Sequence, residues 1–315
     1  MKPISFECKI ITPMFMAGAD GKTPELRPPS IKGMMRFWWR AMHGHLSIEE
    51  LRKKEGELFG SSDEKIGRSK FALSVQRTTE TDDDFIIEEY PLPHHTGNNS
   101  CKYLDKKPSC KKNDRCSKHF PSKAIASDKT FECIIRVKSG DIARVQTIFE
   151  VSIILGGLGK RSRRGFGSIK ILNINGVEYK FDYSPDKISG LLNSVINGGN
   201  EGFESKNGKI EKKNPAKAAY PYIEEIEIGK TYATSWKDLV KKIGKASHDF
   251  DCYHTGFINP YRFASPIYVS IIKDNGDQYL PIITTLNCAF KESVDLPNAE
   301  KKKDKTDEFK KAILS

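Results

Sequence analysis

One glycine-rich, basic stretch constrains the fold of this chain more than any other part of the sequence. Residues 155–167 (LGGLGKRSRRGFG) hold five glycines between an apolar helical pattern and an apolar strand pattern. Glycines allow a backbone to approach a neighbour closely and to adopt positive φ angles. The same stretch carries four cations, which are Lys160, Arg161, Arg163 and Arg164. We therefore expect this loop to bind a polyanion, and the alternative is a solvated turn that happens to be basic.

The patterns on either side of this loop predict the order strand, helix, strand, strand, helix, strand. The predicted strands span residues 4–12, 71–76, 131–138 and 166–174, and the predicted helices span 30–43, 47–60 and 141–155. Ser30 follows two prolines and is a good N-cap, whereas Ser47 and Glu50 have the form of a capping box. This order is typical of the ferredoxin-like fold, an antiparallel sheet with two helices on one face, which RNA-recognition modules also adopt.

The second half of the sequence shows weaker patterns. Residues 183–219 are rich in Gly, Asn and Lys, and we expect a linker or irregular structure there. Strands at 222–228, 267–273 and 279–287, a helix at 235–245 and a charged helix or tail after residue 300 complete the predicted elements. The predicted fold class is therefore α+β, with tandem ferredoxin-like (RRM-like) domains. The first spans 1–180 with an insertion at about 78–130, and the second, degenerate domain spans 181–315.

The charge of the chain indicates its class of partner. The 315 residues carry a formal net charge of +11, which favours an acidic partner, nucleic acid first and an anionic membrane second. No apolar run approaches the length of a membrane span, and the first residues lack the sustained apolar region of a signal peptide. We therefore expect a cytoplasmic protein whose seven cysteines are reduced. An odd number of cysteines also argues against a complete internal disulfide set.

The helix predicted from Ser30 has two distinct faces. The spacing i, i+3, i+4, i+7 places on its apolar face Met34, Phe37, Trp38 and Ala41. A separate basic face carries Lys32, Arg36 and Arg40, bordered by Trp39 and His43. Like charges at this spacing repel by a few tenths of a kcal/mol per pair. An anionic partner would relieve that repulsion, and the alternative is a cationic stripe that faces solvent.

Four motifs carry a family resemblance. They are TPMF at 12–15, LRPPSIKGMMRFWWR at 26–40, ELFG at 57–60 and GGLGKRSRRGFG at 156–167. Together they resemble the RAMP superfamily of CRISPR-associated proteins, and more closely the family of first subunits of the type III-B (Cmr) effector complex. The resemblance is dense over residues 1–60 and 131–175, and weak in the insertion and after about residue 180.

The resemblance implies a non-catalytic RNA-binding subunit at the head of that complex, near the 3′ end of the CRISPR RNA and beside another RAMP subunit. The implied partners are CRISPR RNA, target RNA and other Cmr subunits. The RNA-binding residues that it implies are Lys32, Gly33, Arg36, Trp39, Arg40, Gly156, Gly157, Gly159, Lys160, Arg161, Arg163, Arg164, Gly165 and Gly167. Backbone amides and cations bind phosphates without sequence preference, whereas Trp39 would either stack on a base or belong to the core.

A cluster of cysteines and histidines lies in the insertion. The candidate zinc ligands are Cys101, Cys110, Cys116 and His119. Their spacing is one residue shorter than the Cys-x8-Cys-x5-Cys-x3-His zinc finger that it resembles. Three thiolates and one imidazole suit tetrahedral Zn²⁺, which would supply the core that this poorly apolar segment lacks. We predict a structural zinc ion here, with His94 or His95 as alternative fourth ligands. Unliganded thiols in an irregular loop are the other reading.

The alternative function is a metal-independent endoribonuclease that processes CRISPR RNA. Some RAMP relatives cut RNA with a histidine, and the candidates in this chain are His43, His45, His248 and His254. None of these lies in a recognisable catalytic pair, although His43 is closest to the basic helix face. A Walker A motif is absent from the sequence. A Rossmann motif is absent too, since the glycines follow a helix and precede a strand. The sequence thus favours a binding protein, and a stand-alone cationic RNA-binding protein is a third possibility.

Overall fold

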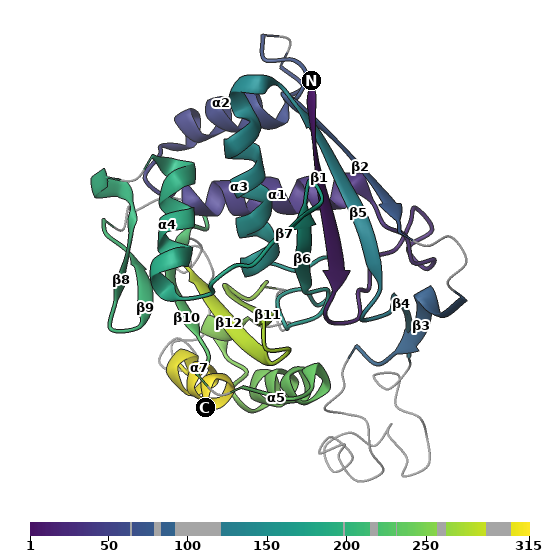
Figure 1. The fold of residues 1–315 in the computed structure, drawn as a ribbon. Coiled ribbons are helices and arrows are strands. Elements are labelled where there is room, and N and C mark those ends of the chain that lie inside the picture. The colour runs from purple at the N-terminus through teal and green to yellow at the C-terminus, as the bar shows by residue number, and fades with distance from the viewer. Residues whose placement is uncertain are drawn as a thin grey trace.

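The structure contains two antiparallel five-stranded sheets with helices packed around them (Figure 1). It is a computed structural model that describes residues 1–63, 65–78, 83–91, 121–197, 199–214, 220–230, 232–256, 263–287 and 304–315. The N-terminus lies at one end of the molecule and the last helix at the other. None of the helices in these ranges combines the length and apolarity that crossing a bilayer requires. The predicted mixture of helices with antiparallel sheets is therefore confirmed.

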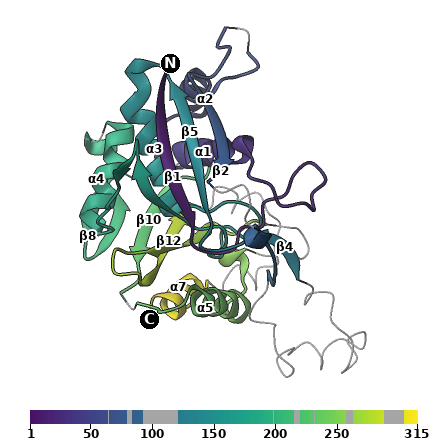
Figure 2. The same ribbon diagram turned by 45° about the vertical axis from the view of Figure 1, so that its right-hand side comes forward.

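The first sheet has the strand order β2-β5-β1-β6-β7, and all neighbouring strands are antiparallel. Its strands are β1 (Lys2–Ile10), β2 (Phe71–Arg77), β5 (Thr130–Val137), β6 (Ile169–Ile174) and β7 (Val177–Glu178). The connecting helices are α1 (Pro28–Met42), α2 (Ile48–Phe59) and α3 (Ile142–Leu155). Alternate residues of β1 are buried because α1 and α3 lie on one side of the sheet, as Figures 1 and 2 show. The element order predicted for this half is confirmed.

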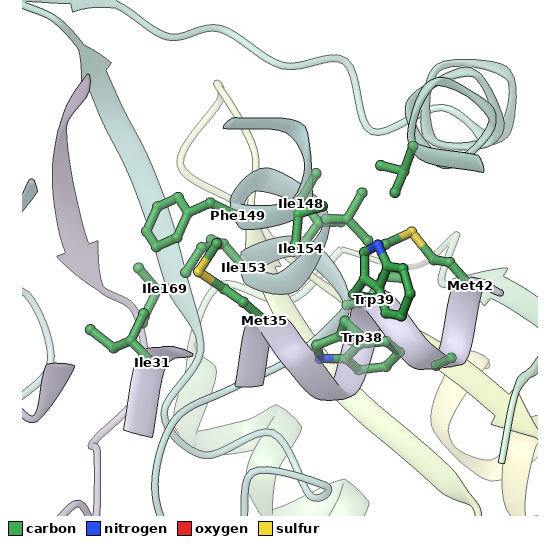
Figure 3. Close-up of a cluster of buried hydrophobic side chains, with 14 of the residues drawn as sticks. Ile31, Met35, Trp38, Trp39, Met42, Ile148, Phe149, Ile153, Ile154 and Ile169 are labelled. Carbon is green, nitrogen blue, oxygen red and sulfur yellow. The ribbon is translucent and has the colours of Figure 1, made fainter. Parts of the chain in front are cut away.

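The core of the first half forms where α1 crosses α3 (Figure 3). Trp38 and Trp39 are both buried, and Met35 and Ile31 point from α1 towards Phe149 of α3. Burying one such side chain contributes roughly 1.5–3 kcal/mol, so this contact stabilises the fold substantially. The helix begins at Pro28 rather than at the predicted Ser30, because proline fits the first turn of a helix.

The last two turns of α3 are buried on every side. Every residue from Ile148 to Leu155 is buried, including the carboxyl side chain of Glu150. The cause is the second half of the chain, since α3 contacts β11, β12 and α4 as well as α1. A helix that is buried all round lies inside a protein rather than at its surface. The helix α3 is therefore the shared centre of the two halves.

The second sheet has the strand order β11-β12-β10-β9-β8. The predicted elements are present as β10 (Ile223–Ile228), α5 (Trp236–Asp249), β11 (Ile267–Lys273), β12 (Tyr279–Leu286) and α7 (Thr306–Leu314). A short antiparallel pair, β3 (Ile86–Glu89) and β4 (Ser122–Ile125), lies within the insertion, near its two ends. Single 3-10 turns lie at Asp83–Phe85, Ser139–Asp141, Gly199–Glu201 and Tyr253–Thr255.

The prediction of a linker at residues 183–219 is wrong for most of that range. The structure has instead α4 (Pro185–Ile196), β8 (Phe203–Lys206) and β9 (Lys209–Lys212). Helical spacing buries Ile188, Leu192 and Val195 against the rest of the protein. Asn207 and Gly208 both have positive φ angles, of 53° and 76°, which suit the tight hairpin turn between β8 and β9. These elements are short and polar, so their apolar positions are few and easily missed.

The charged end of the chain is a helix held by a cluster of ion pairs. In α7, Lys310 binds Glu225 and lies 3.0 Å from Glu227, and Lys209 lies 3.0 Å from both carboxylates. Phe309 of α7 is buried in the adjoining apolar cluster. Burial alone would raise the pKa of Glu225, but the hydrogen bond from Lys310 and the nearby positive charges outweigh it and lower the pKa to about 2.

The lowered pKa of Glu225 predicts a loss of stability in acid. A carboxyl whose pKa is lower in the folded protein than its ordinary value of 4.5 stabilises the fold above that value and loses this contribution as the pH falls. We expect the free energy of unfolding to fall between about pH 5 and pH 2, and Glu225→Gln to flatten this dependence. Urea unfolding at several pH values measures it. The exposed Glu49→Gln is the matched control, and an unchanged profile for Glu225→Gln contradicts the prediction.

Candidate nucleic-acid interface

An open hollow of about 530 Å³ lies beside the first half of α1. Its walls are Lys32 and Arg36 from α1 together with parts of the turn that joins α2 to β2, namely 59–62 and 67–69. The Lys32 ammonium lies 4.8 Å from the centroid of the Phe71 ring. Burial, and then the charge of Arg36, lower the pKa of Lys32. Two cationic side chains of α1 thus border a concave surface lined by serine and glycine.

Gly33 lies on α1 next to this hollow and leaves the helix backbone bare. It is exposed, and no described atom lies within 4 Å of the position that a Cβ atom would occupy. A glycine inside a helix costs about 0.8–1.0 kcal/mol relative to alanine. No contact among the described residues requires a glycine at this position. A ligand that approaches the helix closely at this point would require one.

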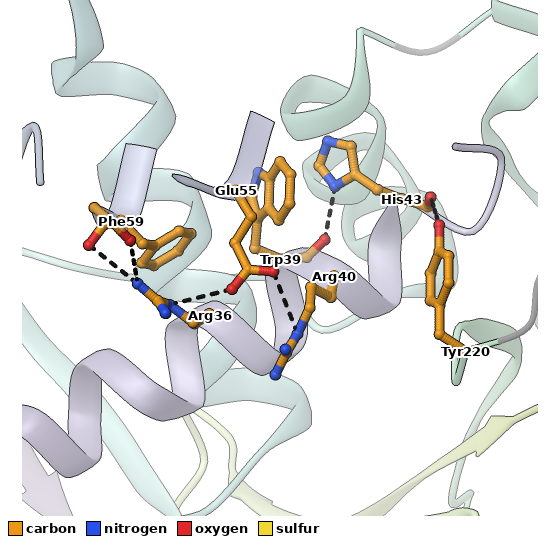
Figure 4. Close-up of polar contacts among 8 residues, drawn as sticks. Arg36, Trp39, Arg40, His43, Glu55, Phe59 and Tyr220 are labelled. Carbon is orange, nitrogen blue, oxygen red and sulfur yellow. Dashed lines mark hydrogen bonds and ion pairs between the residues drawn. The ribbon is translucent and has the colours of Figure 1, made fainter. Parts of the chain in front are cut away.

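The basic face of α1 has an internal partner. Glu55 of α2 lies 3.3 Å from Arg36 and 3.8 Å from Arg40, as Figure 4 shows. Arg36 also donates hydrogen bonds to the carbonyl oxygens of Phe59 and Gly60, at 3.1 and 2.9 Å. The repulsion expected between these arginines is thus relieved within the chain. Arg36 holds the end of α2 in place, and Arg40 remains partly exposed beside it.

The prediction that Trp39 stacks on a base is wrong, because the side chain is fully buried. Its ring lies 4.1 Å from that of His43 and 6.1 Å from that of Phe59, measured between centroids. The helix α1 is covered by α3 on one side and by α2 on another, so both tryptophans belong to the core. A core position was the other of the two roles that the sequence allowed for Trp39.

His43, the main histidine candidate for catalysis, is also buried. Its Nδ1 lies 2.6 Å from the carbonyl oxygen of Trp39, so Nδ1 carries the proton and donates it (Figure 4). Burial lowers the pKa of His43 to about 3, although this hydrogen bond opposes the shift. A general acid or base for neutral pH needs a pKa near 7. The site around His43 is thus poorly suited to cleave RNA.

The glycines of the loop at 156–167 are explained by contacts within the protein. Gly167 has a φ angle of 66°, and a Cβ atom there would lie 1.9 Å from the carbonyl oxygen of Leu158. A Cβ atom on Gly159 would lie 2.5 Å from the carbonyl oxygen of Phe15. Gly156 and Gly157 are similarly crowded. Close backbone approach is present as predicted, but the described partner is the protein's own backbone.

Two of the loop arginines bind the second half of the chain. Arg164 donates hydrogen bonds of 3.0 Å to the carbonyl oxygens of Thr255 and Ile267. Arg163 donates to the carbonyl oxygen of Ser265. Burial, and then the neighbouring arginines, lower the pKa of Arg164 to about 10, so the guanidinium remains charged at neutral pH. Because these donors are directed to backbone carbonyls, we leave Arg163 and Arg164 out of the candidate RNA surface.

The loop presents the Lys160 side chain outward, and Arg161 lies beside it with a buried Nε atom. Lys160 is exposed, while its backbone nitrogen donates to the carbonyl oxygen of Phe15 at 2.9 Å. Arg161 is half-buried with a φ angle of 65°, and its Nε has no hydrogen-bond partner in the described part of the chain. The segment around Phe15 also supports the start of α1, because Arg27 donates to the carbonyl oxygen of Ala17. The loop and α1 therefore flank the same segment.

The uncovered face of the first sheet is unsuited to single-stranded RNA. RNA-recognition modules stack bases on aromatic side chains of that face. Here the outward positions hold Glu7 and Glu132, with Gln76 donating to Glu132 at 2.6 Å and Asn173 donating to Glu7. None of the outward positions of β1, β2 and β5 is aromatic, so these strands offer no platform on which bases could stack. The region of α1 and the glycine-rich loop is the better candidate.

The predicted zinc ligands lie outside the described residues. This applies to each of the four, which are Cys101, Cys110, Cys116 and His119. Within the ranges that the structure describes, no group of three or more His, Cys, Asp or Glu side chains is arranged to hold a metal ion. Cys8, Cys133 and Cys252 are free thiols, as expected for packing residues.

Comparison with known protein families identifies the chain. The model of the RAMP superfamily matches residues 7–170, which is just over half of the sequence. The chain belongs to the RAMP superfamily. A second comparison narrows the family assignment. The CRISPR system Cmr subunit Cmr1-2 of Pyrococcus furiosus is 31% identical over 185 residues, which are 53% of this chain and 93% of that protein. This RAMP protein is thus of the Cmr1 kind.

Other relatives are similar to this chain over a larger part of its length. The Cmr subunit Cmr1-1 of the same organism is 24% identical over 301 residues, covering 85% of this chain and 82% of that protein. The crystal structure of Cmr1 from Pyrococcus furiosus has a TM-score of 0.58 at 19% identity, with 99% of this chain and 96% of that chain covered. A type III-B Cmr-beta complex bound to cognate target RNA contains a chain with a TM-score of 0.57 at 14% identity, and the match covers 99% of both chains. These structures share the fold.

Two features of the hollow in this RAMP protein escaped the sequence reasoning. Arg68 is exposed at its rim, and the turn presents Ser61 and Ser62 beside it. The available signal was the pair Gly60 and Gly67, whose φ angles of 85° and 70° shape the turn. Glycines that bracket a serine pair and an arginine are a weak pattern, because turns of this composition are common.

Substitution of Arg164 and of Lys160, both in the loop, should affect stability to very different extents. Arg164→Ala leaves the carbonyls of Thr255 and Ile267 without their donor, and hydrogen bonds to a charged group contribute about 1.5–3 kcal/mol each. We expect Arg164→Ala to lower the Tm by roughly 5–10 °C. Lys160→Ala removes an exposed side chain and should change the free energy of unfolding by less than about 0.5 kcal/mol. Thermal unfolding followed by circular dichroism checks both, and equal Tm values for the two variants contradict the assignment.

Proposed function

We propose that this chain is a non-catalytic RNA-binding subunit of a type III-B Cmr effector complex. In this proposal it lies at the head of the complex in the cytoplasm, near the 3′ end of the CRISPR RNA and beside another RAMP subunit, and it helps to capture target RNA. Membership of the Cmr1 subunits supports the assembly. The observation that carries RNA binding is the bare, exposed backbone at Gly33 beside Lys32 and an open cationic hollow.

The proposed contact surface uses five residues of the first half, which are Lys32, Gly33, Arg68, Lys160 and Arg161. The lysines and Arg68 supply charge, and Gly33 lets the sugar–phosphate chain approach the α1 backbone. Phosphate contacts of this kind fix the position of a strand without reading its sequence. That suffices where a guide RNA reads the sequence by base pairing. Arg36 and Arg40 support this surface through Glu55.

We also propose that the two sheets are tandem ferredoxin-like domains, at 1–180 and 181–315, with the insertion at about 78–130. The order β2-β5-β1-β6 supports this for the first domain, because it matches strands two, three, one and four of that fold. In the second domain β11-β12-β10 has the order two, three, one, with α5 between the first two strands. The hairpin β8–β9 extends the sheet where a fourth strand would lie, which is the sense in which this domain is degenerate.

The non-catalytic role is supported by the surroundings of the histidines. Besides the buried His43, His45 has a pKa lowered by burial and by Lys212. Neither is paired with a carboxylate in the described part of the chain. An endoribonuclease remains the competing function. Incubating the purified chain with CRISPR repeat RNA separates the two, because cleavage that is lost in His43→Ala would replace the binding role with a catalytic one.

Charge removal at the proposed surface should weaken RNA binding and its salt dependence together. We expect the triple variant Lys32→Gln, Arg68→Gln and Lys160→Gln to reduce affinity for single-stranded RNA. The slope of log K against log salt concentration should fall by about 0.7 for each lost phosphate contact, or about 2 in all. Filter binding at several salt concentrations measures the slope.

The matched control for this variant removes the same charge elsewhere. Lys237, Lys241 and Lys245 are exposed on α5, and changing all three to Gln should leave the slope nearly unchanged. Equal losses in the two triple variants would mean that net charge alone drives binding. Gly33→Ala is the sharper companion variant, since it keeps every charge and adds a Cβ atom to open space. It should weaken RNA binding without lowering the Tm.

We propose, in addition, that the insertion binds one structural Zn²⁺ ion through Cys101, Cys110, Cys116 and His119. Three thiolates and an imidazole are a favoured donor set for tetrahedral zinc. Metal analysis of the purified chain should find about one zinc ion per molecule, and Cys110→Ser with Cys116→Ser should abolish it. Cys252→Ser, outside the insertion, is the control. A zinc content that is unaffected by the double variant rules out these ligands.

A further inference from the structure

A second, more enclosed cavity of about 520 Å³ lies away from the proposed RNA surface. It is bordered by the C-terminal end of α1, one side of α2, the first turns of α3 and the last turn of α4. Its volume falls within the range of about 300–1,000 Å³ that is usual for small-molecule sites. The function proposed above makes no use of it.

The charged side chains around this cavity are mainly cationic. Lys54 from α2, Lys70 before β2 and Arg144 from α3 line it, against one carboxylate, Glu57. Lys70 lies 3.8 Å from Asp141, which is the N-cap residue of α3. Lys54 and Arg144 form no ion pair or side-chain hydrogen bond with any residue that the structure describes. The partly buried Arg144 and the exposed Lys54 at the rim are thus both available to a ligand in this space.

Two polar atoms at the cavity have no hydrogen-bond partner in the described part of the chain. They are the buried Nε of Arg144 and the buried Nδ1 of His45. Buried polar atoms are nearly always paired, so an orphaned pair at one cavity indicates a ligand. His43 is itself 4% exposed and lines the same space. Because its Nδ1 donates to Trp39, its Nε2 is an acceptor.

The two helix ends at the cavity favour different groups on a ligand. The N-terminal turn of α3 contributes Ala143, and Gly140 lies in the 3-10 turn just before it. The N-terminus of a helix favours a negative charge. The C-terminal turn of α4 contributes Ser194 and Asn197, and the last carbonyl groups of a helix accept hydrogen bonds. An occupant that matches both ends carries an anionic group at one side and hydroxyl donors at the other.

We propose that this cavity binds a phosphate monoester that bears hydroxyl groups, with its phosphate on Arg144 and Lys54 and its hydroxyls towards the end of α4. The Nε2 atom of His43 accepts a hydrogen bond from one of the hydroxyl groups of this ligand. The source of the phosphate is either a small sugar phosphate or the terminal phosphate of an RNA strand.

Isothermal titration calorimetry of the full chain with ribose 5-phosphate tests this site. We expect saturable binding with one ligand per chain, and no binding of ribose. Arg144→Gln and Lys54→Gln, on opposite walls, should each weaken it by about tenfold or more. Two variants guard against a folding defect in either one, and Lys241→Gln on α5 is the charge-matched control. Equal binding of ribose, or unchanged binding in both cavity variants, overturns the proposal.

Short RNAs distinguish the two sources of the phosphate group. A tetranucleotide with a 3′-phosphate is compared with the same tetranucleotide ending in a 3′-hydroxyl. Tighter binding of the phosphorylated strand than of ribose 5-phosphate, lost in Arg144→Gln, identifies an RNA end as the ligand. Tighter binding of ribose 5-phosphate identifies a small sugar phosphate. Failure of both to bind rejects the site, and it leaves the RNA surface at Gly33 untouched because the two sites share no residue.

Discussion

The contact between the glycine-rich loop and β11 is the interaction on which the rest of this structure depends. The nitrogen of Gly165 donates to the carbonyl of Val269 at 2.8 Å, and the nitrogen of Val269 donates to the carbonyl of Arg163 at 3.2 Å. Arg164 then spans from this backbone pairing to Thr255 and Ile267. A buried guanidinium loses several favourable contacts when its partners leave, so the two halves resist separation. The all-round burial of α3 has the same origin.

This contact also decides which groups remain for a ligand. The loop uses its glycines and two of its arginines internally, and it leaves Lys160 on the outside. The helix α1 is divided in a similar way, because Glu55 and the end of α2 bind Arg36, whereas Lys32 and Gly33 face open space. The basic groups that remain on the surface of the first half are therefore few, and they come from α1, from the turn before β2 and from the glycine-rich loop.

The sequence predicted the element order of the first half well, because its apolar periodicities are strong and its caps are clear. It failed at Trp39 since periodicity assigns one apolar face to a helix, whereas α1 is covered by both α2 and α3. It failed at Arg163 and Arg164 because a basic loop gives no sign of carbonyls that lie about a hundred residues later in the chain. The helix α4 was missed because three spaced apolar residues in a polar segment are a faint signal. Gly33 was found through the family motif, and its open surroundings only through the structure.

The position of α7 has a consequence for how the protein is made. Arg164 lies 5.3 Å from the ring of Phe309, and its carbonyl partners also belong to the second half. During synthesis the loop therefore leaves the ribosome before the residues that bind its arginines have been made. A nascent chain that stops within α5 lacks Thr255, Ser265 and Ile267, so the guanidinium groups of Arg163 and Arg164 have none of these carbonyl partners. Synthesis through β11 supplies the carbonyls, and α7 then adds the ring of Phe309 beside Arg164, so the completed chain withdraws two cations that the unfinished chain leaves open to any anion.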